Sequence, residues 1–247
     1  MSNFLLIIPA RLESVRFPNK LLKKINGIEV IKYVWLRCLK AVQKKNVYVA
    51  TGNKEIISFC KNNNINYIKT SKNCVTGTDR ILEVAKKIKK DFYINVQGDE
   101  ILVNPLSIKK VINLCTKYKN KFIINAYTKV QSTKEFFNKN VPKVVINKDN
   151  NLMYISRAGI PSNKKNIYIK GLKQVCIYAY PRDILLKIKK NKKTYLESIE
   201  DIEILRFLEN NILVKMAKVV GSEISIDIPK DLILAKKIIL RKKNNVV

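Results

Sequence analysis

Three cations stand close together on a short stretch near the N-terminus. Arg11, Arg16 and Lys20 follow an apolar run that predicts a buried strand, and Pro9 and Pro18 restrict the backbone around them. A guanidinium binds phosphate through two parallel N–H groups, and an ammonium adds a compact charge. These residue types at this spacing suit the polyphosphate group of a ligand. The residues leave one alternative open, a basic surface loop without a ligand.

Two carboxylates could hold a metal ion beside such a polyphosphate. Asp99 follows an apolar run and a glycine, and Asp227 shortly precedes a proline that opens a helical pattern. Mg²⁺ beside a nucleotide is held by one or two carboxylates together with phosphate oxygens and water. Asp227 alone is typical of a helix N-cap, and the pair favours a magnesium site more than either residue does.

The chain contains no histidine, which excludes an imidazole as base, nucleophile or metal ligand. Nucleotidyl transfer can proceed without one, because it needs an aligned nucleophile and neutralised charge on the phosphate groups. The composition is therefore compatible with nucleotidyl transfer and argues against acyl transfer. The five cysteines include no Cys-x-x-Cys pair, so we expect reduced packing residues and neither disulfides nor a zinc site.

The formal net charge of +30 in 247 residues raises a nucleic-acid-binding module as a competing function. However, the lysines are scattered along every segment, which is typical of a compositional bias on solvated helix faces. We therefore expect no nucleic-acid partner. The apolar runs are too short to span a membrane and no secretory signal pattern precedes the first strand, so we expect a cytosolic protein without membrane insertion.

Strands and helices alternate in the first half of the chain, as in βαβ units that form a mostly parallel sheet with helices on both faces. The pattern predicts strands at 4–8, 47–51, 67–68 and 92–96, and helices at about 31–42, 54–62, 76–88 and 105–118. Ligands of such sheets bind outside the carboxyl ends of the strands. The loops after Ile8, Thr51 and Val96 should therefore converge.

Strands predominate in the second half. We predict strands at 122–130, 143–146, 152–156, 174–180 and 213–219, a helix around 200–209 and a last helix from Asp227 to about Leu240. The chain has neither an internal repeat nor a low-complexity linker. We therefore expect residues 1–247 to form one domain, in which a mixed-sheet lobe at about 122–195 has a function of its own.

Several motifs, in this order, resemble those of the CMP-sugar-acid synthetases over nearly the whole chain. They are Ile7-Ile8-Pro9-Ala10-Arg11 with Arg16, Pro18 and Lys20; Thr76-Gly77-Thr78-Asp79-Arg80; Asn95-Val96-Gln97-Gly98-Asp99-Glu100; Ser156-Arg157-Ala158 with Ile160-Pro161; Ile177-Tyr178-Ala179-Tyr180; Glu203 to Arg206; and Asp227 with Pro229, Asp231 and Leu232. The resemblance implies an α/β fold of the nucleotide-diphospho-sugar transferase type, a Rossmann-like α/β/α sandwich. It also implies that the lobe binds sugar and forms a homodimer contact.

The resemblance further implies a reaction, in which the anomeric hydroxyl of a 3-deoxy-ulosonic acid such as Kdo attacks the α-phosphate of CTP and releases pyrophosphate. The product would serve lipopolysaccharide or capsule synthesis. The implied catalytic residues are Arg11, Lys20, Asp99 and Asp227, the last two holding Mg²⁺. The implied nucleotide-binding residues are Ala10, Arg11, Arg16, Lys20, Thr76, Gly77, Thr78, Arg80 and Gln97. The implied substrate-binding residues on the sugar side are Arg157, Gln174, Tyr178 and Glu203.

Three positions depart from the family pattern. Asn19 replaces the usual glycine, Gln174 the usual histidine and Ile204 the usual glutamine. The last two lie on the sugar side of the implied site, where losing a hydrogen-bonding group changes how a substrate hydroxyl is recognised. The identity of the substrates therefore stays open: the sugar acid could be a relative of Kdo, including an amino-substituted one, or the nucleotide could be a different one. Tyr178 could instead pack in the sheet, and Glu203 could lie on a solvated helix face.

Overall fold

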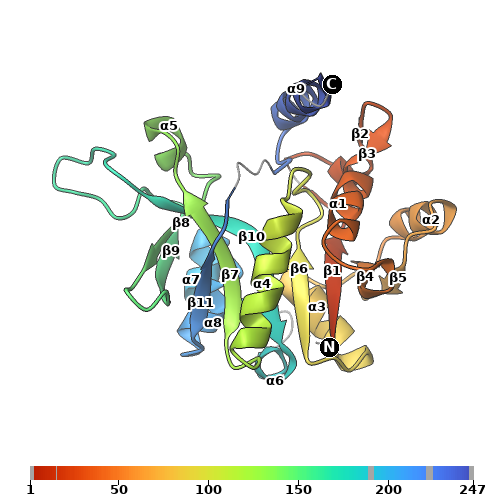
Figure 1. The fold of residues 1–247 in the computed structure, drawn as a ribbon, viewed down its shortest axis with the longest axis horizontal. Coiled ribbons are helices and arrows are strands. Elements are labelled where there is room, and N and C mark those ends of the chain that lie inside the picture. The colour runs from red at the N-terminus through yellow and green to blue at the C-terminus, as the bar shows by residue number, and fades with distance from the viewer. Residues whose placement is uncertain (1–2, 15, 189–191, 221–224, 245–247) are drawn as a thin grey trace.

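A single mixed sheet forms the centre of the molecule (Figure 1). The computed structural model describes residues 3–14, 16–188, 192–220 and 225–244. The main path of the sheet runs in the order β11-β7-β10-β6-β1-β4-β5, and β8 and β9 are attached through β10. The strands are β1 (Phe4–Ala10), β4 (Val47–Thr51), β5 (Tyr67–Lys69), β6 (Phe92–Val96), β7 (Ile123–Lys129), β8 (Lys143–Ile146), β9 (Leu152–Ser156), β10 (Leu172–Pro181) and β11 (Val214–Lys218).

Strand β10 runs antiparallel to both β6 and β7, whereas β1 is parallel to β4 and β6, and β11 is parallel to β7. Near its start β10 also pairs with β8, and β8 pairs with β9. These two strands, α5 (Thr133–Phe136) and the loop at 157–171 project from the sheet on the left of Figure 1. Residues 122–195 were expected to form a separate lobe. In the structure, β7 and β10 of this segment belong to the central sheet, and only the elements between these two strands project from it.

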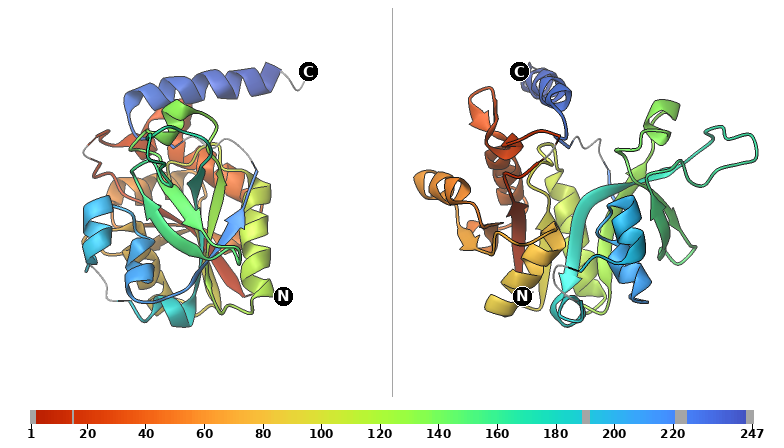
Figure 2. Two further views of the ribbon diagram at one scale, coloured as in Figure 1. Left: turned by 90° about the vertical axis from the view of Figure 1, so that its left-hand side faces the viewer. Right: turned by 180° about the vertical axis from the view of Figure 1, so that it is seen from behind.

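Helices cover both faces of the sheet (Figure 2). The side chains of β1 alternate between two core clusters, because successive residues of a strand point to opposite faces. Leu6 and Ile8 pack with α1 (Val30–Leu39) and α4 (Pro105–Lys117). Leu5 and Ile7 pack on the other face with α3 (Gly77–Lys87) and α8 (Leu205–Glu209). The result is a three-layer α/β/α sandwich.

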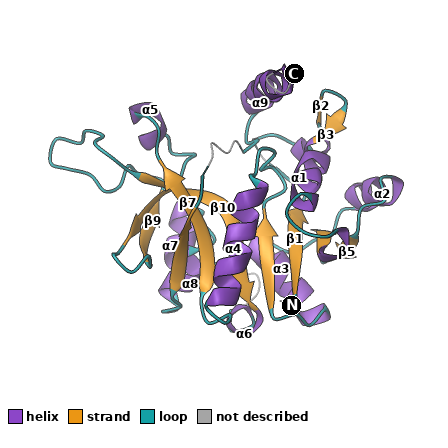
Figure 3. Cartoon of the chain, in the orientation of Figure 1, coloured by secondary structure: helices purple, strands orange, loops and turns teal. Residues whose placement is uncertain are grey.

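The other elements are short or lie at the edges (Figure 3). They are the hairpin of β2 (Lys24–Ile25) and β3 (Ile28–Glu29), the 3₁₀ turns Lys20–Leu22 and Lys44–Asn46, and the helices α2 (Lys54–Asn62), α6 (Arg182–Leu185), α7 (Tyr195–Glu200) and α9 (Pro229–Asn244). In Figure 3 the carboxyl end of β1 points towards the side of the molecule on which α9 lies. Within the described ranges, every helix is too short or too polar to cross a membrane.

The predicted bounds of β4, β6, β8, β9 and α2 are confirmed to the residue. The single helix predicted around 200–209 is wrong, because the structure has α7 and α8 with a connection between them. Asp201 has φ 50°, a left-handed conformation that ends α7. Glu203 consequently lies on a connection rather than on a helix face, and this connection reaches the N-terminus of α3.

Candidate active site

The basic stretch after β1 and the two predicted metal carboxylates meet at the carboxyl end of the parallel strands. Lys20 Nζ lies 2.5 Å from Asp99 Oδ2 and 3.4 Å from Asp227 Oδ1. Arg16 Nη2 donates to the same Asp227 oxygen at 2.9 Å. These four residues, which we call the charged cluster, pair two cations with two carboxylates. The structure thus brings together residues from three distant parts of the chain.

Main-chain contacts fix the carboxylates of the charged cluster. Asp99 follows shortly after β6, and its carbonyl oxygen accepts the N–H of Ile226 at 3.1 Å, which ties the segment before α9 to the end of β6. Asp231, in the first turn of α9, accepts the N–H of Asp227 at 2.9 Å. Both carboxylates therefore sit on backbone that is itself anchored, which suits a site that must keep its geometry.

The backbone that leads into the charged cluster is closely packed. Asn19 adopts φ 56° and ψ 21°, the left-handed conformation that glycine adopts most readily and asparagine tolerates. The asparagine therefore keeps the turn before Lys20 that the family makes with glycine. Ala10, expected to bind nucleotide, is 1% exposed and ends β1. A Cβ added to Gly98 would lie 3.1 Å from the Pro9 carbonyl oxygen, so a side chain here would fit only if the neighbouring backbone moved slightly.

The electrostatics of the charged cluster favour the ionised form of Lys20. Burial lowers the pKa of the Lys20 ammonium, but the carboxylate of Asp99 and then that of Asp227 raise it more, so its pKa lies above the ordinary value. Asp99 Oδ1 is buried and has no hydrogen-bond partner among the described residues. Leaving such an oxygen without a partner is costly, and a hard cation would satisfy it. The two carboxylates therefore fit a divalent metal ion.

The predicted nucleotide-binding loop at 76–78 forms the N-terminus of α3, and side chains bind its N–H groups. Glu203 accepts from the N–H groups of Gly77 and Thr78 at 3.1 and 2.6 Å, and from Thr78 Oγ1 at 2.5 Å. Thr76 and Asp79 form a capping box, with Asp79 Oδ2 accepting the Thr76 N–H at 3.0 Å and Thr76 Oγ1 accepting the Asp79 N–H at 3.1 Å. All four N–H groups at 76–79 are thus bound within the protein.

The other predicted nucleotide-binding residues differ in exposure. Arg11 is exposed, and its Nη1 donates to the carbonyl oxygen of Val75 at 3.0 Å, which joins the stretch after β1 to the loop before α3. Arg80 is 3% exposed and donates to Thr70 Oγ1 at 2.5 Å. Gln97 is partly exposed beside the end of β6. In the structure Arg11 and Gln97 are accessible to a ligand, whereas Arg80 supports the loop from inside.

Arg157, which the resemblance implies for the sugar side, has a guanidinium bound by main-chain carbonyl groups. Its Nε donates to Glu200 O at 2.5 Å, Nη1 to Lys139 O at 3.1 Å and Nη2 to Asp201 O at 2.9 Å. The side chain of Glu200 in turn accepts the Arg157 N–H at 2.9 Å. Arg157 thus joins the segment after β9 to the α7–α8 connection and to the loop before β8.

The sequence did not single out a second cation, Lys143, which lies beside Arg157. Lys143 is fully buried, and its Nζ donates to the carbonyl oxygens of Asn138, Val141 and Arg157 at 2.9, 2.5 and 2.7 Å. Burial and then the neighbouring Arg157 lower the pKa of Lys143 to about 8. The ammonium is held by a cage of carbonyl groups and pairs with no carboxylate among the described residues, so it stabilises this loop at a cost in desolvation.

Gln174 and Tyr178 lie on β10 and are largely enclosed. Gln174 is 9% exposed, and its Nε2 donates to Asn125 Oδ1 at 2.9 Å. Tyr178 is 3% exposed, and its ring stacks on Tyr180 with centroids 5.7 Å apart. Ile204, expected on the sugar side, has no exposed surface and belongs to the second core cluster. The apolar side chain of Ile204 therefore packs in the core in this structure, and the expectation that the missing amide changes substrate recognition stays a prediction.

Sequence reasoning missed the residues that support these groups. Arg206 is 1% exposed, and its Nε and Nη2 donate to the two Glu197 carboxylate oxygens at 2.7 and 2.8 Å, while Nη1 donates to Asp79 Oδ1 at 2.7 Å. Asn140 Oδ1 accepts from Arg16 Nη1 at 2.9 Å. Arg206 stood in one of the family-like motifs but no role could be assigned from its position, and nothing in the sequence marked Asn140.

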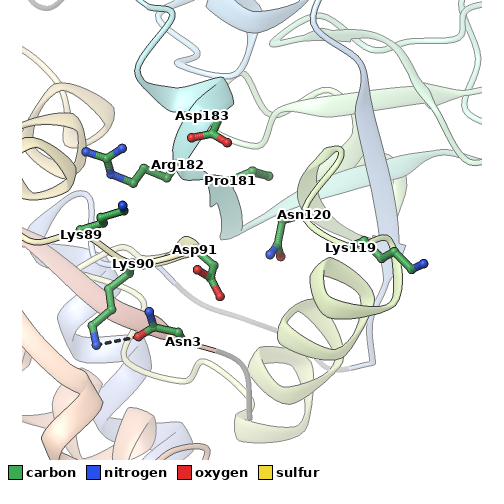
Figure 4. Close-up of a pocket in the computed structure, with 9 residues that line it drawn as sticks. All are labelled: Asn3, Lys89, Lys90, Asp91, Lys119, Asn120, Pro181, Arg182 and Asp183. Carbon is green, nitrogen blue, oxygen red and sulfur yellow. Dashed lines mark hydrogen bonds between the residues drawn. The ribbon is translucent and has the colours of Figure 1, made fainter.

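Two surface hollows lie apart from the charged cluster. The hollow in Figure 4, of about 430 Å³, lies beside the amino ends of β1 and β6, whereas the charged cluster lies at their carboxyl ends. Its lining residues are Asn3, Lys89, Lys90, Asp91, Lys119, Asn120, Pro181, Arg182 and Asp183. The second, of about 650 Å³, lies between α2 and β5. Neither lining includes a residue that the sequence predicted for catalysis or binding, so we do not place the active site in either hollow.

Comparison with known proteins identifies the family. The cytidylyltransferase family matches residues 5–224. The 3-deoxy-manno-octulosonate cytidylyltransferases of Fusobacterium nucleatum subsp. nucleatum and Legionella pneumophila (strain Paris) are 36% and 37% identical, covering 98% and 96% of this chain and 98% and 97% of theirs. A solved CMP:2-keto-3-deoxy-manno-octonic acid synthetase complexed with CTP is 28% identical with a TM-score of 0.88, covering 98% of this chain and all of that one (100%). The predicted fold is therefore confirmed, and the chain belongs to the cytidylyltransferase family, in the group of the 3-deoxy-manno-octulosonate cytidylyltransferases.

Proposed function

We propose that this protein transfers CMP from CTP to the anomeric hydroxyl of Kdo and releases pyrophosphate. The observation that carries the proposal is the charged cluster, in which the cations of the basic stretch meet two carboxylates at the carboxyl end of the sheet. The relatives that align over nearly the whole chain are 3-deoxy-manno-octulosonate cytidylyltransferases. The related solved structure holds CTP, which supports cytidine as the base.

In the proposed reaction the cations bind the triphosphate and orient its α-phosphate for attack. Arg11 is exposed and Arg16 half-exposed, so both can bind phosphate oxygens with little rearrangement. The anomeric hydroxyl gives its proton to solvent, and its oxygen forms a bond to the α-phosphorus. The bond from this phosphorus to the bridging oxygen breaks, and pyrophosphate leaves with the electron pair. Lys20 and the two arginines neutralise the charge that builds up on the departing pyrophosphate, which is the main demand of this chemistry.

Asp99 and Asp227 are the residues that we propose to hold Mg²⁺. The partnerless Asp99 Oδ1 and the convergence of both carboxylates on one ammonium support this assignment. Bound there, Mg²⁺ would supply positive charge to the phosphate oxygens. Lys20 keeps the two carboxylates together in the structure described here. A metal ion bound to them would replace Lys20 as their partner and leave its ammonium for a phosphate oxygen.

For the sugar side we propose Arg157, Gln174, Tyr178 and Glu203, as the family resemblance implies. Their exposed surface in this structure is small, since main-chain groups or neighbouring side chains bind most of their polar atoms. A second candidate substrate, an amino-substituted Kdo, is favoured by Gln174, whose amide replaces the usual ring and can accept a hydrogen bond from an amine. Both substrates share the same chemistry at the anomeric carbon.

The remaining proposals concern organisation. We propose one nucleotidyltransferase domain over 1–247 that forms a homodimer through the projecting part of 122–195, acts in the cytoplasm and serves lipopolysaccharide or capsule synthesis. Support for the dimer comes from exposed apolar side chains there, since Met153, Ile167 and Ile169 are 61%, 56% and 72% exposed. Exposed apolar side chains that gather on one part of a surface are typical of an interface.

A pyrophosphate-release screen tests the function. Purified protein is incubated with Mg²⁺ and each combination of CTP, UTP or GTP with Kdo, 8-amino-Kdo or another ulosonic acid. We expect release that needs CTP, metal and Kdo together. No release with any 3-deoxy-ulosonic acid would contradict the proposal, and equal release with all three nucleotides would contradict cytidine specificity. Preference for 8-amino-Kdo would favour the second candidate.

A further inference from the structure

A buried ion network joins the α7–α8 segment to the N-terminus of α3. Arg206 in α8 binds Glu197 in α7 and Asp79 in α3, and all three side chains are at most 1% exposed. Such a group of charges is stable only when each charge is paired, and breaking one pair leaves a buried charge uncompensated. Burial lowers the pKa of the Arg206 guanidinium, but the hydrogen bonds to Glu197 and Asp79 raise it more. Arg206 is therefore a fixed cation at every working pH.

The network reaches the loop that precedes α3 through Asp79. One Asp79 oxygen binds Arg206, and the other accepts both the N–H and the Oγ1–H of Thr76 at 3.0 and 2.9 Å. Arg206 thus holds the carboxylate that caps α3. Next to Thr76, the carbonyl oxygen of Val75 accepts from Nη1 of Arg11, one of the proposed triphosphate ligands. Three successive contacts therefore lead from a core arginine to a residue of the candidate active site.

The same end of α3 is held a second time from the α7–α8 connection. Glu203 accepts the N–H groups of Gly77 and Thr78. Gly77 also packs on the end of β1, since a Cβ at this position would lie 3.3 Å from Pro9 Cγ and 3.4 Å from Glu203 Oε1. The loop is thus enclosed between the Pro9–Arg11 segment on one side and the α7–α8 segment on the other, so a shift of α8 moves the loop against Arg11.

We propose that Arg206 is a positioning residue for the nucleotide. Through Asp79 it sets the 75–78 loop against the 9–11 segment and thereby determines the affinity for CTP, without touching the substrate itself. The identity of the nucleotide rests on the function proposed above. A residue that acts in this way changes KM for the nucleotide, whereas a merely structural residue lowers stability and the amount of active protein without changing KM.

The test compares Arg206→Lys and Asp79→Asn with the control Glu135→Gln. Lysine keeps the charge but lacks the planar fork that binds two carboxylates at once. Asparagine keeps an oxygen for Thr76 but loses the ion pair with Arg206. The control removes the carboxylate that pairs with Lys173, in a partly buried ion pair outside the 75–78 loop. Steady-state kinetics with CTP and Kdo varied separately, thermal unfolding, and hydrogen exchange of the amides at 76–79 are measured for each protein.

We expect both variants to raise KM for CTP about tenfold or more, because small displacements of positioning groups have effects of this size. We expect kcat at saturating CTP and KM for Kdo to stay within about threefold. The amides at 76–79 should exchange faster than in the control. The proposal is overturned if KM for CTP stays within about twofold in both variants, or if KM rises equally for CTP and Kdo. If the unmodified protein does not turn over CTP and Kdo, the proposed function fails, and unchanged exchange at 76–79 alone then overturns the role of Arg206.

Discussion

The nucleotide half and the sugar half of the candidate site hold their charged side chains in different ways. In the nucleotide half, Arg16 and Lys20 are bound by the carboxylates of Asp99 and Asp227, and the partners are side chains near the surface. In the sugar half, the cation of Arg157 is bound by three main-chain carbonyl groups. In the nucleotide half the partners are side chains, which a ligand can replace. In the sugar half the partners belong to the main chain and cannot be replaced without moving it.

This difference separates the effects that substitutions should have. A phosphate group can replace a carboxylate as the partner of Arg16 or Lys20, so these side chains are ready to change partners when a ligand binds. Carbonyl groups of the main chain cannot move away without a change in the loops that contain them. Substitutions of Arg16 or Lys20 should therefore reduce activity more than stability, and substitution of Arg157 should do the reverse.

The largest effect is expected for Asp99→Asn. The variant keeps the shape of the side chain but loses a charge beside Lys20, and it removes the better of the two proposed metal ligands. We expect turnover to fall by about 10³-fold, comparable with the loss of a group that stabilises charge in a transition state. Turnover by pyrophosphate release and thermal unfolding are measured in parallel. Full activity of a folded Asn variant would contradict the metal role of Asp99. It would also contradict the expectation that substitutions in the nucleotide half reduce activity.

Next in size is the pH dependence of stability caused by Lys143. Its pKa is about 8 in the folded protein, below the ordinary value of 10.5, because of burial and then of Arg157. Between these two pH values the unfolded chain binds more protons, so the free energy of unfolding should rise with pH from about 8 upwards, by on the order of 3 kcal/mol in total. The cost of burying the charge is present in full below pH 8.

Urea unfolding of the unmodified protein and of Lys143→Met at pH 7.5 and pH 10 measures this contribution. Many other lysines titrate in the same range, and subtracting the variant's slope removes their contribution because they are common to both proteins. We expect the unmodified protein to gain stability relative to the variant as pH rises. Equal slopes would show that burial and Arg157 do not lower the pKa of Lys143 in the folded protein.

A smaller effect is expected when Arg157 and Arg11 are each replaced, and the two variants should differ in whether stability or activity falls. Arg157→Met leaves three carbonyl groups without their donor and should lower the free energy of unfolding by about 1–3 kcal/mol. Arg11→Met, the matched variant in the nucleotide half, removes one hydrogen bond of an exposed side chain and should change stability by less than about 0.5 kcal/mol. Arg11→Met should instead reduce kcat/KM for CTP. If both variants lost activity alone, or stability alone, the contrast between the two halves would not hold.

The smallest effect is expected at Gln174. Gln174→Leu keeps the size of the side chain and loses the amide that binds Asn125. We expect KM for Kdo to rise roughly two- to tenfold, the value of one hydrogen bond, while KM for CTP stays unchanged. Kinetics with each substrate varied separately distinguish the two. A change in KM for CTP alone would place Gln174 outside the sugar half.

The sequence predicted the fold well because its strands are short apolar runs and its helices have regular apolar spacing. It predicted the meeting of Lys20 with Asp99 because the carboxyl ends of parallel strands share one edge of a sheet. It could not predict the break between α7 and α8, since this depends on Asp201 taking a left-handed conformation that its residue type does not require.

Roles on the sugar side were harder to predict for a physical reason. A motif tells which residue types stand at which positions, but not which hydrogen-bond partner each side chain has. Arg157 and Glu203 have the chemistry to bind a sugar acid, and main-chain groups bind them in this structure. Ile204 lacks the amide expected to bind a substrate hydroxyl, and only the structure shows that its side chain packs in a core cluster. These distinctions depend on long-range contacts that no local pattern contains.

The excess of basic residues determines how this protein should respond to salt, and the carbonyl cage around Lys143 shows how one of these residues is held without a carboxylate. The chain has 49 lysines and arginines but 19 aspartates and glutamates, so carboxylates are scarce as partners. The unpaired surface cations repel one another, and this repulsion weakens as ionic strength rises, because the screening length falls to about 8 Å at 0.15 M. The buried ammonium, bound to carbonyl dipoles, is out of reach of dissolved ions. Salt should therefore stabilise this protein, unlike one whose folded state depends on surface ion pairs.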